Sequence, residues 1–108
     1  MNDMLMTWEQ KLQALQSLAD CELHMRRPGD WFVNQRVQIG GNGLLTGSYG
    51  NGATPEKAVE DHWKVLTNLD LDQYLVISAS SIRERQHVRW NGFMWEALPV
   101  QQRATAGT

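Results

Sequence analysis

The stretch from Gly50 to Leu66 reads GNGATPEKAVEDHWKVL and gives the clearest structural signal in the chain. Thr54 stands where an N-cap residue accepts a backbone hydrogen bond, and Pro55 follows at the first helical position, where its missing N–H costs nothing. The pattern predicts a helix that starts at Pro55 and stops at Asn68. Its buried face, read from the helical period, is expected to contain Ala58, Val59, His62, Trp63 and Leu66.

Upstream of this helix the sequence predicts strands. Trp31–Val33 and Arg36–Ile39 are expected to form two short strands or one bent strand, and 44–49 is expected to form the returning strand. A glycine-rich turn over 40–43 connects them. A second glycine-rich segment over 50–53 is expected to be a flexible connection that leads into the helix.

The N-terminal part of the chain predicts another helix, over residues 7–24. Thr7 and Gln10 have the spacing of a capping box, and apolar residues follow at helical spacing. The single cysteine, Cys21, falls inside this predicted helix and is expected to be a small buried or half-buried side chain. The segment 26–30, which contains proline and glycine, is expected to end the helix.

Downstream of the second helix, a short strand over 74–78 and a hairpin are expected. Gln86–Trp90 and Phe93–Ala97 flank Asn91-Gly92, and such a pair between strand-like runs is a strong hairpin signal. A two-residue turn would place Trp90 opposite Phe93.

Alternation along this hairpin separates two kinds of side chain. One face is expected to join the core and contains Val88, Trp90, Phe93 and Trp95. The opposite face contains His87, Arg89, Met94 and Glu96, with Arg83 and Arg85 added if the strand begins early. We predict a ligand-binding or partner-binding site on this opposite face, because a row of basic side chains can hold a phosphate or a carboxylate. The alternative is a solvated sheet face with Glu84 and Glu96 as local partners.

Taken together, these elements predict one α+β domain over residues 1–100, followed by a disordered tail over 101–108. Two helices are expected to pack on a mostly antiparallel sheet, in the order α-β-β-β-α-β-β-β. Hydrophobic residues make up 42% of the 108 residues, which suffices for one compact core. Five tryptophans are expected to fill much of that core.

The composition argues against several functional classes. The net charge is −2, so general affinity for double-stranded nucleic acid is not expected. One cysteine makes neither an internal disulfide nor a zinc site, and it favours a reducing, cytoplasmic setting. No apolar run has the length of a membrane span. No signature links a serine to a histidine and an acid, so we expect no enzyme and no cofactor.

Two stretches, GNGATPEKAVEDHWKVL and RWNGFMWEAL, resemble small uncharacterised accessory proteins of tailed bacteriophages. The resemblance implies a protein of the host cytoplasm, and many such proteins block a host factor, including bacterial defence components or their nucleotide signals. The order helix, strands, helix, with GxGxT opening the second helix, is similar to the double-stranded-RNA-binding domain. Pro55 and Glu56 stand where that family has phosphate-gripping lysines, so the likeness implies the fold rather than the binding. The glycine turn, threonine cap and following helix are also similar to those of HicB-type antitoxins, whereas the N-terminal helix departs from that pattern.

The sequence therefore predicts a non-enzymatic accessory protein that acts by stoichiometric binding. Its partner would be a host protein or a small anionic or nucleotide ligand. A nucleic-acid-binding or antitoxin-like regulator is one alternative, and an assembly protein that forms oligomers is another; a homodimer is compatible with each. Substitution of Arg85 and Arg89 by alanine is expected to weaken binding and to leave folding intact.

Overall fold

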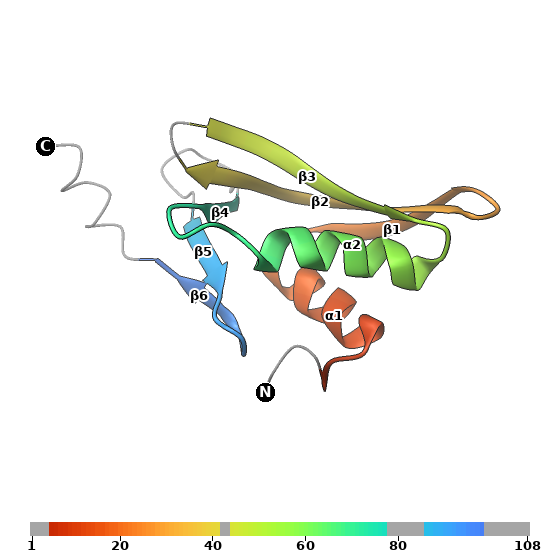
Figure 1. Ribbon diagram of the computed structural model, residues 1–108, viewed down its shortest axis with the longest axis horizontal. Helices are drawn as coiled ribbons and strands as arrows, with labels where there is room; N and C mark the ends of the chain where they lie inside the picture. The colour runs from red at the N-terminus through yellow and green to blue at the C-terminus, as the bar shows by residue number, and fades with distance from the viewer. Residues whose placement is uncertain (1–4, 42–43, 78–85, 99–108) are drawn as a thin grey trace, which may run out of the picture.

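A computed structural model describes residues 5–41, 44–77 and 86–98. Six antiparallel strands form one sheet, and both helices lie on the same face of it (Figure 1). In chain order the elements are α1 (Trp8–Leu18), β1 (Cys21–Arg27), β2 (Asp30–Gly41), β3 (Leu44–Gly52), α2 (Pro55–Thr67), β4 (Tyr74–Ile77), β5 (Gln86–Trp90) and β6 (Trp95–Ala97). The predicted α+β class, with two helices on an antiparallel sheet, is confirmed.

β2 is the central strand of the sheet. Its first half, as far as Gln35, pairs with β1, and its second half, from Val37, pairs with β4. β1 and β4 therefore lie end to end along one side of β2, while β3 pairs with the other side. β5 pairs with β4, and β6 pairs with β5.

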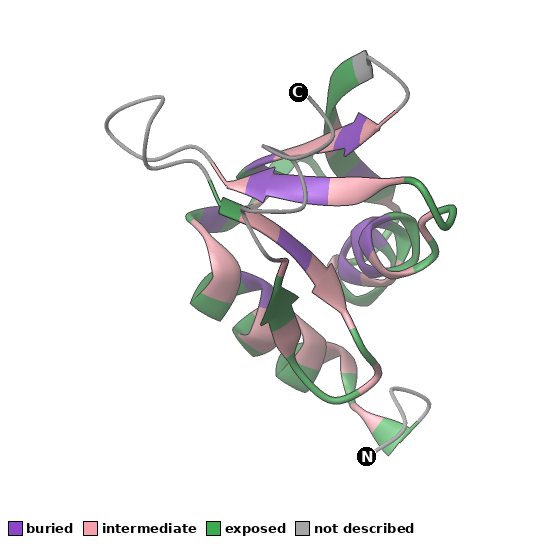
Figure 2. Ribbon diagram, turned by 90° about the vertical axis from the view of Figure 1, so that its left-hand side faces the viewer, coloured by how far each residue is buried: buried purple, intermediate pink, exposed green. Residues whose placement is uncertain are grey.

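The core lies between the sheet and the helices. Along β2, Val33 and Val37 are buried while Asn34 and Arg36 are exposed, as expected for a strand with one covered face. In Figure 2 the buried residues of α2 are turned toward the buried residues of the strands. The predicted buried face of α2 is confirmed for all of its members: Ala58, Val59, His62, Trp63 and Leu66.

Three tryptophans fasten the C-terminal hairpin to this core. Trp63, Trp90 and Trp95 contact one another edge to face, with ring centroids 4.9, 5.8 and 4.9 Å apart. Such pairs add about 0.5–1.5 kcal/mol each beyond the area that they bury. The Trp95 Nε1–H donates to the carbonyl oxygen of Ala14 at 2.8 Å. The hairpin is thus joined to both helices.

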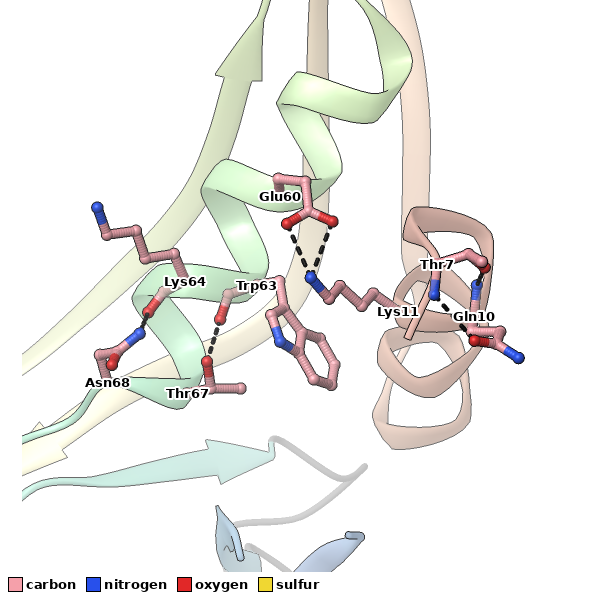
Figure 3. Close-up of polar contacts among 8 residues, drawn as sticks. All are labelled: Thr7, Gln10, Lys11, Glu60, Trp63, Lys64, Thr67 and Asn68. Atoms are coloured by element: carbon pink, nitrogen blue, oxygen red, sulfur yellow. Dashed lines mark hydrogen bonds and ion pairs between the residues drawn. The ribbon is translucent and has the colours of Figure 1, made fainter. Parts of the chain in front are cut away.

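Both helices begin at the predicted caps. The Thr7 hydroxyl accepts from the Gln10 N–H and the Gln10 side chain accepts from the Thr7 N–H, which completes the capping box (Figure 3). At α2, the Thr54 hydroxyl accepts from a backbone N–H of the first turn. The ammonium group of Lys11 lies 2.8 and 2.9 Å from the two carboxylate oxygens of Glu60 and ties the helices together (Figure 3).

The predicted N-terminal helix is wrong in its second half. α1 ends at Leu18, and Cys21–Arg27 forms β1, which turns through Pro28-Gly29 into β2. Gly29 has a φ of 79°, which a tight turn requires and which glycine adopts without strain. Pairing with β2 outweighs the local helical spacing of this segment. Cys21 is buried as expected, but in a strand.

The strands that flank the glycine turn are longer than predicted. The two segments expected at 31–33 and 36–39 belong to the single strand β2, which has a register irregularity between Asn34 and Gln38. β3 continues to Gly52 through the segment expected to be a flexible connection. Residues 42 and 43 of the predicted turn, and the predicted tail over 101–108, lie outside the described residues.

The predicted register of the C-terminal hairpin is also wrong. Trp90 faces Trp95, and the connection contains four residues instead of the expected Asn91-Gly92 alone. The Asn91 side-chain oxygen accepts from the N–H groups of Phe93 and Met94, both at 2.9 Å, and so holds the wider turn. Phe93, expected in the core, is therefore 69% exposed in the loop. The shift is two residues, so the strand residues keep their predicted faces.

Candidate binding surface

The face of the sheet that points away from the helices is called the open face here. No helix of the described residues covers it. Residues opposite each other in antiparallel strands share a face, so the register places its side chains in rows. One row across three strands contains His24, Phe32 and Asn51. The next row contains Glu22, Asn34 and Tyr49.

The Phe32 ring is the centre of a packed group on the open face. His24 stacks on it with centroids 5.2 Å apart and the rings inclined by 30°. The Arg26 guanidinium lies 4.2 Å from the same ring, within the range of a cation–π contact. Arg26 also donates to the Asn51 side-chain oxygen at 3.0 Å and to Asp30 at 3.2 Å. These contacts hold flat side chains in a fixed arrangement at the surface.

Tyr49 and Arg36 extend this group. Tyr49 is 61% exposed, although it lies in a strand beside Asn34. Arg36 is exposed at the gap between the ends of β1 and β4, beside a hollow of about 270 Å³ that Asp20 and Glu22 also line. Arg36 makes no ion pair with any residue that the structure describes. The open face thus presents an uncovered aromatic ring, an amide and an available guanidinium.

Three residues of the predicted hairpin site, His87, Arg89 and Glu96, lie on the same face. His87 is opposite Val76 on the open face, and its ring stacks on Tyr74 with centroids 4.2 Å apart. Arg89 and Glu96 are opposite each other in β5 and β6. Met94 lies in the loop instead and is 61% exposed. Arg83 and Arg85 are outside the described residues, so the predicted basic row stays a prediction.

Arg89 stabilises the connection between α2 and β4. Its guanidinium donates to the carbonyl oxygens of Leu69, Asp70, Leu71 and Gln73, at 3.4, 2.9, 3.0 and 2.8 Å. The side chain therefore clamps the connection between α2 and β4. This geometry speaks against the expectation that its substitution leaves folding intact.

Arg89→Ala is expected to destabilise the protein by about 2 kcal/mol, since hydrogen bonds to a charged group contribute roughly 1.5–3 kcal/mol. Arg89→Lys should recover only part of this loss, because an ammonium group cannot reach the carbonyls that the planar guanidinium fork spans. Urea denaturation of the two variants and the parent measures the effect. An unchanged midpoint for Arg89→Ala would show that the clamp is unimportant.

A buried polar network joins β2 to both helices. The Gln35 Nε2 donates to the carbonyl oxygens of Leu15 and Ala19, at 2.6 and 3.2 Å. Its Oε1 is therefore the acceptor for the His62 Nε2–H, at 2.8 Å, which fixes the histidine tautomer. Burial lowers the pKa of His62 to about 4, and the Asp61 carboxylate opposes that shift only in part. His62 is a neutral structural residue.

Sequence reasoning predicted that His62 is buried, but it missed the Phe32 group and Tyr49. The signal was present in CELHMRR, where alternate residues His24 and Arg26 share a face once the segment is read as a strand. Among the described residues no three His, Cys, Asp or Glu side chains gather to hold a metal ion. No described helix has the length and apolar character to cross a membrane.

Comparison of the chain with protein-family models, curated proteins and solved structures found no match. The case for a function therefore depends on the geometry of the open face.

Proposed function

We propose that this chain is a non-enzymatic binding protein that holds a nucleotide on the open face. The exposed ring of Tyr49 beside the Phe32 group is the observation that supports the proposal most. Stacking of a base on an aromatic side chain contributes on the order of 1–3 kcal/mol. The Asn34 amide beside Tyr49 can both donate to and accept from the edge of a base. Arg36 supplies a cation for the phosphate.

The charges of the open face favour stacking over phosphate neutralisation. Arg26 and Arg27 share Asp30 at 3.2 and 3.3 Å, and His24 lies 3.7 Å from Glu22. Because both arginines already have an acidic partner, few counterions would leave on binding. The affinity should therefore depend only weakly on salt, unlike that of a regulator that grips a phosphate backbone.

The resemblance to bacteriophage accessory proteins suggests a setting for this binding. A stoichiometric nucleotide binder in the host cytoplasm would remove a signal that a bacterial defence system requires. Masking of a host protein is the alternative, and it predicts no affinity for nucleotides.

Isothermal titration calorimetry with adenosine monophosphate, a cyclic dinucleotide and a ten-nucleotide single-stranded RNA tests the proposal. We expect Tyr49→Ala to weaken binding about tenfold or more, since it removes one stacked base. Adenosine, titrated beside the three probes as a phosphate-free reference, should bind more weakly than adenosine monophosphate, and Arg36→Ala should abolish this difference. Phe93→Ala removes a similarly exposed ring in the hairpin loop and should leave the nucleotide affinity unchanged.

The three probes also separate the sources of the nucleotide. Binding of the RNA alone, with steep salt dependence, would favour a nucleic-acid-binding regulator. The absence of heat with all three probes would refute nucleotide binding.

A further inference from the structure

The edges of the sheet are protected unequally. β1 carries Glu22, His24 and two arginines, and β6 has only three residues, including Glu96. Charge and shortness are the usual devices that keep an edge strand from pairing with another chain. β3 has nine residues with the sequence LLTGSYGNG, without a charge or a proline. In the described part of the chain it pairs only with β2, and it forms the outer strand in Figure 1.

One hydrogen bond identifies the groups of β3 that point outward. The Asn51 N–H donates to the Asp61 carboxylate at 3.0 Å, so at Asn51 the backbone points away from β2. N–H and C=O groups alternate in direction along a strand, so those of Leu45, Gly47 and Tyr49 also point outward. No backbone hydrogen bond to another described element satisfies these three residues. Within the described residues, the unpaired edge is therefore centred on Gly47.

We propose that β3 pairs with β3 of a second copy of this chain, antiparallel about a two-fold axis at Gly47. In this register Gly47 faces its own copy, and Leu45 faces Tyr49 of the other copy on both sides of the axis. Every outward-pointing group from Leu45 to Tyr49 then finds a partner, as an isologous contact requires. The next outward N–H group, that of Asn51, already donates to the Asp61 carboxylate, so the pairing ends there.

The side chains on this edge fit the same arrangement. Leu45 and Tyr49 are 45% and 61% exposed, and both belong to the open face. Cross-strand pairs of an aromatic and an aliphatic side chain stabilise a sheet, whereas like charges directly opposite destabilise it. Because the strand is uncharged, self-pairing brings no like charges together. The two open faces become one continuous surface in the dimer.

Sedimentation velocity over a concentration series, without nucleotide, tests the dimer. The parent is expected to dimerise, and Gly47→Lys should weaken dimerisation at least tenfold because two ammonium groups would meet at the axis. A Cβ at Gly47 has no atom within 4 Å, and its φ lies outside the left-handed region, so the monomer should tolerate the substitution. Gly47→Thr is the uncharged control and should keep the dimer.

Cross-linking tests the register. In Gly47→Cys the facing Cα atoms would be about 5.5 Å apart, which suits a disulfide. Leu45→Cys is the matched control, because Leu45 and its own copy would lie four residues apart along the strands, roughly 13 Å. Cys21 should not interfere, since burial raises the pKa of its thiol to about 11.

A parent that stays monomeric at all concentrations would overturn the proposal, as would dimerisation of Gly47→Lys at the parent's affinity. Selective cross-linking of Leu45→Cys would reject this register. These measurements contain no nucleotide, so a negative result would reject the dimer without rejecting nucleotide binding. In the same way, a negative titration with nucleotides would not reject the dimer.

Discussion

Gly50→Ala is expected to prevent stable folding. A Cβ at this position would clash with the carbonyl oxygen of Ala58 and would lie 2.6 Å from the backbone nitrogen of His62. Both atoms belong to the backbone of α2, so no side chain can move aside and the helix would have to leave β3. We expect a loss of about 4 kcal/mol or more, which is a large part of the roughly 5–15 kcal/mol that stabilises a domain.

Gly47→Ala in the same strand is the control for this prediction. A Cβ there meets no atom within 4 Å, so stability should stay within about 0.5 kcal/mol of the parent. Circular dichroism and urea denaturation at low protein concentration measure both variants. Equal midpoints for Gly50→Ala and the parent would show that α2 does not pack on β3 as closely as described.

Acid is expected to destabilise the protein through His62. The pKa of this imidazole falls from its ordinary 6.5 to about 4 on folding, because burial disfavours the charged form. Between these values the unfolded chain binds a proton that the folded chain does not. Stability is therefore complete above pH 6.5 and decreases as the pH falls toward 4, by about 3 kcal/mol in all.

His62→Gln separates this effect from the titration of carboxylates. The variant keeps an N–H donor for Gln35 and has no group that titrates in this range. We expect it to be less stable than the parent at pH 7 and to lose less stability between pH 6.5 and 4. Urea denaturation at several pH values measures the two slopes, and identical slopes would exclude His62 as the cause.

The sequence could predict α2 almost residue by residue because its signals are local. Thr54 and Pro55 mark the start, and the helical period gives the buried face. The capping box at Thr7 is local in the same sense. β1 could not be predicted in this way, since Cys21–Arg27 becomes a strand only through pairing with β2.

In the candidate site, too, local features could be predicted and features that depend on strand pairing could not. The faces of the C-terminal hairpin could be predicted because alternation survives a register error of two residues. The exposed position of Phe93 could not, since it depends on the side chain of Asn91. Tyr49 and Phe32 become neighbours only through the register of β2 and β3.

β1 and β4 share one side of β2, and this arrangement connects the N-terminal and C-terminal parts of the chain. Residues 8–67 contain both helices and the strands β1, β2 and β3, and β3 pairs along both halves of β2. The later strands join this sheet where β4 pairs with Val37–Gly40. The two parts therefore depend on each other: the C-terminal strands need β2 as a partner, and Trp63 and the Ala14 carbonyl are covered by Trp90 and Trp95.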